Sequence, residues 1–159
     1  MKLVNLIQED FTNYKKPSLF LGFPECSGKC NIINGKIVCQ NEALRNAEKV
    51  EISANEIVEL YIKNNITKAL VCGGLEPFDT SKDLIELIKA FRKITDDDIV
   101  IYTGYTEPEI KNMEIYAALL QYPNIIIKYG RYIMNQQPHY DEVLGVYLAS
   151  YNQYARNIT

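Results

Sequence analysis

Short apolar runs alternate along the chain with segments whose apolar residues recur at helical spacing. Four runs are apolar enough to predict buried strands, and they span residues 18–23, 68–72, 99–103 and 125–129. Weaker runs at residues 2–8 and 143–149 predict a strand near each end of the chain. Residues 131–142 show neither pattern, so we predict an irregular loop there.

Helix-start signals precede the segments with helical spacing. Ser53 with Glu56, and Thr106 with Glu109, form capping boxes, in which the first side chain caps the helix and the glutamate reaches back to it. The two boxes predict helices that extend to about residue 64 and about residue 120. Thr80 is placed to cap a third helix, which follows it with apolar positions at helical spacing.

This alternation of strands and amphipathic helices predicts a parallel sheet with right-handed crossovers. The chain supplies about three to four such units, too few to close an eight-stranded barrel. We therefore predict an α/β fold, an open partial (βα) barrel with a central parallel sheet. A chain of 159 residues has the length of one domain, so residues 1–159 are predicted to form a single domain.

Composition and charge exclude some classes of partner. The chain is 47% hydrophobic, enough for an ordinary core. Its net charge is -3 and no basic patch stands out, which argues against nucleic acid. No apolar run approaches the roughly 20 residues of a membrane span, and the first ten residues do not resemble a secretory signal. We expect a cytoplasmic protein with no membrane partner, in a compartment where thiols stay reduced.

The loop after the first confident strand holds three of the four cysteines. Cys26, Cys30 and Cys39 have polar neighbours, which is unusual for core cysteines and typical of metal ligands. Cys72 lies in an apolar strand, where a free cysteine packs as a small hydrophobe. Zinc prefers four ligands in a closed structural site, whereas a four-iron cluster can be held by three thiolates with one iron left open. We favour a metal site over scattered core cysteines, and a cluster over zinc.

Unusual loops follow each of the other inner strands, at residues 73–77, 103–105 and 129–131. The carboxyl ends of parallel strands meet at one edge of a sheet, where such folds place their sites. Gly73 and Gly74 would let a ligand approach the backbone, although a glycine pair alone is more often a tight turn. We therefore expect one site at this edge.

Together these segments resemble the radical S-adenosylmethionine superfamily. CSGKC, from Cys26 to Cys30, is similar to the first two cysteines of its CxxxCxxC cluster motif, and CGGLEPF at residues 72–78 resembles its GGEP segment. Within the superfamily, the chain resembles the activating enzymes of anaerobic ribonucleotide reductase. IYTGYTEPEI at residues 101–110 resembles their YTGYT segment, and LASYNQYA at residues 148–155 resembles their SSNQ segment.

Two departures from those motifs stand in the sequence. The third motif cysteine would fall at position 33, which is Ile33, so Cys39 is the only nearby replacement. Leu75 separates the glycine pair from Glu76. The first departure lengthens the loop before the third cysteine, and the second changes the point from which the carboxylate reaches.

The resemblance implies an iron–sulfur enzyme that reductively cleaves S-adenosylmethionine to a 5′-deoxyadenosyl radical. The implied ligands of its [4Fe-4S] cluster are Cys26, Cys30 and Cys39. The implied contacts to S-adenosylmethionine are Gly73, Gly74, Glu76, Thr103, Lys128 and Arg131, with Asn152 and Gln153 as weaker candidates. No residue is assigned a catalytic role, because the bound cofactors supply the chemistry.

The implied protein substrate is a glycyl radical enzyme, anaerobic ribonucleoside-triphosphate reductase, served by a flavodoxin or ferredoxin-type electron donor. Two alternatives stay open. The same chemistry could act on a small molecule or peptide, or the chain could be a non-catalytic iron–sulfur module for electron transfer or binding. Cleavage of S-adenosylmethionine by the reduced protein separates the enzymes from the module.

Overall fold

A six-stranded sheet forms the centre of the structure, a computed structural model that describes residues 1–159. Its strand order is β10-β7-β6-β5-β3-β2. The strands are β2 (Asn5–Asp10), β3 (Ser18–Phe23), β5 (Ala69–Gly74), β6 (Asp98–Tyr102), β7 (Ile125–Tyr129) and β10 (Tyr154–Asn157). The four inner strands are parallel, and the two edge strands run antiparallel to them. The predicted α/β class with a central, mostly parallel sheet is confirmed.

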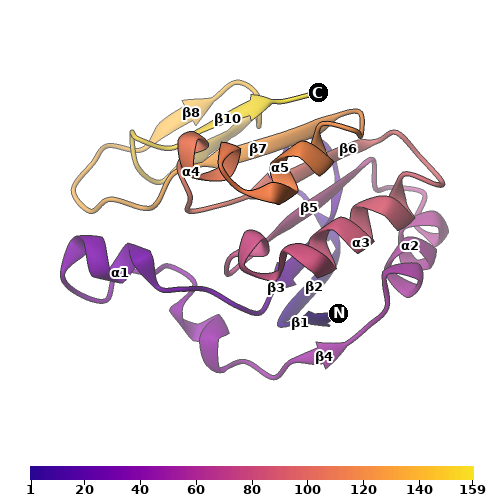
Figure 1. Cartoon of the computed structure of the whole chain (residues 1–159), viewed down its shortest axis with the longest axis horizontal. Helices are drawn as coiled ribbons and strands as arrows, with labels where there is room; N and C mark the ends of the chain where they lie inside the picture. Colours follow the sequence, from indigo (N-terminus) through magenta and orange to yellow (C-terminus); the bar gives the residue numbers. More distant parts are fainter.

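Helices cover one face of this sheet, and Figure 1 shows α3 and α5 lying across the strands. They are α2 (Ala54–Lys63), α3 (Ser81–Phe91), α4 (Glu107–Lys111) and α5 (Glu114–Leu119). The larger core cluster lies between the helices and the sheet, and a smaller one covers the opposite face. Burial on both faces explains why the inner strands are continuous apolar runs. None of the helices has the length and hydropathy needed to cross a bilayer.

Both predicted capping boxes form. Ser53 Oγ accepts the N–H of Glu56 at 3.2 Å, and the Glu56 carboxylate accepts the N–H of Ser53 at 2.8 Å. Glu109 likewise accepts the N–H of Thr106 at 2.8 Å, and α4 begins there. Thr80 precedes α3 as predicted, but its side chain makes no cap bond. Three helix starts are therefore placed correctly, and two of them use the predicted bonds.

The helix predicted from residue 106 to about 120 is wrong, because two short helices stand in its place. Met113 between them is extended, with φ -88° and ψ 140°, and interrupts the helical ladder. Ile110 and Ile115 are both buried in the larger core cluster. Residues five apart point about 140° away from each other around a continuous helix, so the break lets both side chains reach the core.

The strand predicted at residues 2–8 is divided between two sheets. β1 (Lys2–Leu3) pairs with β4 (Val50–Glu51), whereas β2 joins the edge of the central sheet beside β3. Val4, between β1 and β2, donates its N–H to the Gly22 carbonyl at 2.8 Å. The chain therefore stays beside β3 while it changes sheets.

The strand predicted at residues 143–149 forms only in part. Only β9 (Val146–Leu148) is extended, and it pairs with β8 (His139–Asp141), inside the segment expected to be irregular. The strand that completes the central sheet is β10, which pairs with β7. The buried Asp141 carboxylate links the two regions, because it accepts the N–H of Ala155 in β10 at 2.8 Å. A long-range bond of this kind leaves no periodic signal in the sequence.

Candidate functional site

The loops that follow β3, β5, β6 and β7 lie beside one another at the carboxyl edge of the sheet. The N–H of Glu76 donates to the Glu25 carbonyl at 2.7 Å, and the N–H of Gly130 donates to the Tyr105 carbonyl at 2.9 Å. The Thr103 hydroxyl donates to the Glu76 carboxylate at 2.8 Å and joins the middle pair of loops. The structure thus gathers at one edge the segments that the sequence singled out.

Three cysteines lie on the long connection between β3 and β4. Cys26 precedes α1 (Lys29–Asn34), Cys30 lies within that helix, and Cys39 precedes the 3-10 helix η1 (Glu42–Asn46). All three are partly exposed free thiols. Cys26 and Cys30 line one small cavity of about 20 Å³, and Cys39 is outside it. No three Cys, His, Asp or Glu side chains are grouped closely enough to hold a metal ion.

Positive charges and N–H groups face the two sulfur atoms in this cavity. Burial raises the pKa of the Cys26 and Cys30 thiols, while Arg45 beside Cys26 and Arg131 beside Cys30 act to lower it. The N–H of Gly28 also donates to Cys26 Sγ at 3.3 Å. These groups favour the thiolate, which is the form that binds metals, but burial outweighs them and the pKa of both thiols is raised on balance. In its chemistry, the donor set therefore fits a thiolate-bound cluster.

Cys72 lies in β5 and is fully buried in the larger core cluster. Its strand neighbours are Leu21 in β3 and Ile101 in β6. Burial holds the pKa of its thiol well above the usual range. Cys72 is therefore an inert part of the apolar core, as its sequence setting predicted.

The Glu76 carboxylate is the buried centre of this edge and lines the small cavity with Cys26 and Cys30. Only 5% of the residue is exposed. Besides the Thr103 bond, it accepts the N–H of Phe78 at 3.2 Å and that of Gly104 at 2.8 Å. Burial raises the pKa of Glu76 to about 7, although these donors act to lower it. The Glu76 side chain therefore has a structural role in the protein without any ligand, because it joins the loops after β5 and β6.

The raised pKa of Glu76 predicts a stability that falls with pH. Between pH 4.5 and about 7, the folded chain holds a proton on Glu76 that the unfolded chain has released. The contribution of this proton to the free energy of unfolding is complete below pH 4.5 and is lost as the pH rises through about 7. Glu76→Gln removes the titration, so urea unfolding of the cluster-free variant should show a flatter pH profile. Equal slopes for the two proteins would contradict this assignment.

Two basic side chains from the end of β7 complete the edge. Lys128 is buried and donates to the Gly130 carbonyl at 3.0 Å. Burial lowers the pKa of Lys128 to about 8, and the nearby Glu76 opposes this shift. Arg131 donates to both oxygens of Glu109, at 2.8 and 2.9 Å, and these bonds hold the pKa of Glu109 at about 2. A cofactor at this edge would therefore have to share or replace existing partners.

The glycine pair that ends β5 is explained in part by strand packing. A Cβ on Gly74, whose φ is +80°, would lie 2.6 Å from the Cα of Gly22 in β3. A Cβ on Gly73 would lie 3.0 Å from the Phe20 ring. Protein atoms, rather than open space, therefore stand at both Cβ positions. The sequence indicates two reasons for glycine here, the approach of a ligand and a tight turn. The structure adds a third, which is close contact with β3.

Gly74→Ala should therefore destabilise the fold. A left-handed backbone costs an L-residue roughly 1–2 kcal/mol, and the added Cβ would meet backbone, which cannot rotate away. We expect the free energy of unfolding, measured in urea, to fall by about 2–4 kcal/mol. Gly35→Ala is the matched control, because Gly35 has φ +64° but nothing near its Cβ position. Equal losses in the two variants would show that contact with β3 carries no cost.

The weaker candidates Asn152 and Gln153 brace the loop after β7. Gln153 is buried and donates to the Gly130 carbonyl at 3.1 Å. Asn152 donates to the Arg131 carbonyl at 2.8 Å. These two bonds go to backbone atoms of the loop after β7, so both residues support the shape of the edge.

Asp79 is a structural link that the sequence analysis missed. Its carboxylate accepts the N–H of Ser27 at 2.8 Å and the hydroxyl of Tyr105 at 2.6 Å. It therefore ties the cysteine loop to the loop after β6. Its only signal in the sequence is its place three residues after Glu76, within the same polar turn.

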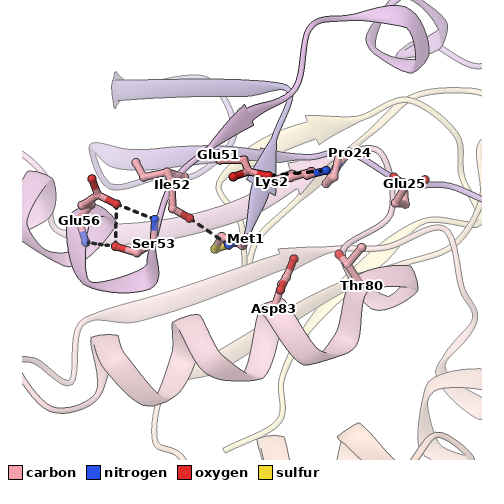
Figure 2. Close-up of a pocket in the computed structure, with 10 residues that line it drawn as sticks. All are labelled: Met1, Lys2, Pro24, Glu25, Glu51, Ile52, Ser53, Glu56, Thr80 and Asp83. Atoms are coloured by element: carbon pink, nitrogen blue, oxygen red, sulfur yellow. Dashed lines mark hydrogen bonds and ion pairs between the residues drawn. The ribbon is translucent and has the colours of Figure 1, made fainter.

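A wider cavity of about 560 Å³, shown in Figure 2, is lined by ten residues that include Glu25, one residue before Cys26. Three of its carboxylates already have partners inside the protein, in the pairs Glu25–Lys49, Glu51–Lys2 and Glu56–Ser53. No cysteine lines this cavity, and none of the predicted cofactor contacts does. The candidate site is therefore the smaller cavity at the sheet edge.

Comparison with known families indicates which group the clustered thiols bind. Residues 17–154 match the family described as 4Fe-4S single cluster domain. The chain belongs to this family. The family is associated with radical S-adenosylmethionine enzymes, and the match spans all four cysteines. Searches of curated proteins and of solved structures each gave no match. Membership supports a [4Fe-4S] cluster as the bound group and favours it over zinc.

Proposed function

We propose that this protein is a radical S-adenosylmethionine enzyme whose cluster is held by Cys26, Cys30 and Cys39. One observation carries the proposal: in a chain of the single-cluster family, two of these thiols share a cavity with the buried Glu76. When bound, the cluster and S-adenosylmethionine supply a one-electron reductive cleavage that yields a 5′-deoxyadenosyl radical. The chain itself binds and orients these groups and excludes water from them.

The residues at this edge of the sheet, of which Glu76 and Arg131 line the cavity, suit the two ends of an amino acid. The Glu76 carboxylate can accept bonds from an ammonium group, with Gly73, Gly74 and Thr103 beside it. Lys128 and Arg131 supply positive charge for a carboxylate or for ribose oxygens. These roles are part of the proposal, and they are supported by the burial of Glu76 and Lys128 at the same edge.

Binding of a cofactor this large requires the cysteine loop to move. The present cavity, about 20 Å³, has room for about one water molecule. α1 buries none of its residues, and Figure 1 shows it projecting beyond the end of the sheet. Its displacement therefore sacrifices little apolar packing. The four parallel strands follow one another in chain order with helices on one face, which supports an open partial barrel whose mouth is this edge.

We further propose a protein substrate, a glycyl radical enzyme of the anaerobic ribonucleotide reductase type. Ile32, Ile33 and Ile37 are between 57% and 73% exposed on the cysteine loop. Neighbouring apolar side chains in solvent are typical of a surface that contacts another protein. A partner seated there would also shield the site from water. A flavodoxin or ferredoxin-type donor would supply the electron.

The test uses the anaerobically reconstituted, reduced protein mixed with S-adenosylmethionine and the candidate reductase from the same genome. We expect release of 5′-deoxyadenosine and a glycyl doublet in the electron paramagnetic resonance spectrum, lost when the target glycine is replaced by alanine. Cleavage without a doublet would overturn the partner and favour a small-molecule or peptide substrate. A loaded cluster with no cleavage would overturn the enzyme and favour a binding or electron-transfer module, which the small cavity also suits.

A further inference from the structure

Cys39 is separated from Cys30 by a long loop, yet its backbone is tied to the residue next to Cys30. Asn31 Oδ1 accepts two N–H groups, from Val38 at 2.9 Å and from Cys39 at 3.1 Å. One side-chain oxygen therefore closes the loop that begins at Cys30 and ends at Cys39. The contact sets where the Cys39 backbone lies relative to α1.

The other end of the same side chain leads to Cys26. Asn31 Nδ2 donates to Glu42 Oε2 at 3.2 Å, and that oxygen also accepts Arg45 Nε at 3.1 Å. Arg45 in turn donates to the Cys26 carbonyl at 3.3 Å, and its Nη2 donates to Cys26 Sγ at 3.8 Å. A continuous chain of hydrogen bonds therefore runs from Cys39 through three polar side chains to Cys26.

These polar contacts have little competition from apolar packing. Neither α1 nor η1 buries any of its residues. The fit around the guanidinium is also close, since a Cβ on Gly28 would lie 3.2 Å from Arg45 Nη2. An arginine fork that contacts a carboxylate and a carbonyl together has a direction that a lysine cannot reproduce. The position of Cys39 thus depends on polar contacts, which include this hydrogen-bonded chain and the bond from Asn41 Nδ2 to the Gly74 carbonyl at 2.6 Å.

We propose that Asn31, Glu42 and Arg45 are positioning residues that fix the Cys39 backbone relative to the segments of Cys30 and Cys26, and so compensate for the long loop between the thiols. The inference rests on the proposed function, in which the three thiols bind one cluster. Removing outer groups that orient metal ligands typically lowers metal affinity by about 10–100-fold. We expect a loss of that order in cluster affinity for Asn31→Ala.

The experiment first measures thiol proximity in the metal-free protein. Limiting diamide removes two electrons and two protons from a pair of thiols as a disulfide forms, and peptide mapping then quantifies the Cys30–Cys39 bond. Asn31→Ala should lower its yield about tenfold, because the effective concentration of the two thiols falls. Asn46→Ala is the matched control, since Asn46 lies in η1 outside the chain of hydrogen bonds.

A reciprocal variant separates positioning from a general loss of structure. In Asn31→Asp/Glu42→Gln the acceptor for the two N–H groups is kept and the new amide can donate to the new carboxylate, but the single oxygen that accepted both Asn31 and Arg45 is lost. The Cys30–Cys39 disulfide yield should therefore return toward the wild-type value, whereas iron content should recover only in part. An unchanged yield in Asn31→Ala, or no recovery in the reciprocal variant, would overturn the inference. If the yields behave as expected but even the wild-type chain binds no iron, the proposed function fails and the positioning role stands.

Discussion

Alanine at Cys26, Cys30 or Cys39 should each abolish cluster loading, whereas Cys72→Ala should leave it intact. The first three thiols are partly exposed on the loop at the sheet edge, and Cys72 is sealed in the core. A cluster with only three protein thiolates has no spare ligand, so each loss should be nearly complete. The measurement is iron and sulfide per chain after anaerobic reconstitution, together with the visible absorption of the cluster.

Cys72→Ala serves as the internal control for this series. It deletes a buried sulfur and should lower the free energy of unfolding by about 1 kcal/mol while the cluster is retained. Full loading in Cys39→Ala would show that Cys39 is not a ligand. Loss of the cluster in Cys72→Ala alone would contradict the whole assignment.

Glu76→Ala should have the second large effect, on stability and on cofactor binding together. The substitution leaves the Phe78 and Gly104 N–H groups and the Thr103 hydroxyl without their acceptor in the interior. Each buried donor without a partner costs about 1–3 kcal/mol, and water entering the space left behind would satisfy some of them. We therefore expect the free energy of unfolding to fall by about 2–4 kcal/mol.

The same variant should bind S-adenosylmethionine at least about tenfold more weakly, because a charge-assisted bond is lost. Calorimetry on the cluster-loaded protein measures this, and iron content checks that loading is retained. Glu86→Ala, on the exposed face of α3, is the matched control and should change neither property. Unchanged binding in a folded Glu76→Ala variant would place the cofactor elsewhere.

Local patterns were sufficient for the elements that form the frame of this fold. The apolar runs predicted β3 and β7 at their observed bounds, and β5 and β6 to within one or two residues. These strands are buried on both faces, so nearly every position along them favours an apolar residue. The capping boxes at Ser53 and Thr106 could also be predicted from the sequence, because their bonds join residues three apart.

Local patterns failed where one element depends on another that is distant in sequence. Ile110 and Ile115 both read as helical, and only their shared core makes the break at Met113 favourable. β10 carries no strong strand signal, yet it completes the sheet because β7 offers it an unpaired edge. The bond from Asp141 to Ala155 then fixes that pairing.

The same division applies to the candidate site. The sequence by itself determined which loops carry chemistry, because strand ends and cysteine spacing are local properties of the chain. Only the tertiary structure decided the partners: Glu76 with Thr103 and Gly104, and Asn31 with the Cys39 backbone. Hydrogen bonds join atoms about 3 Å apart, and which polar groups come that close depends on how the parallel strands are ordered and how the loops fold over their ends.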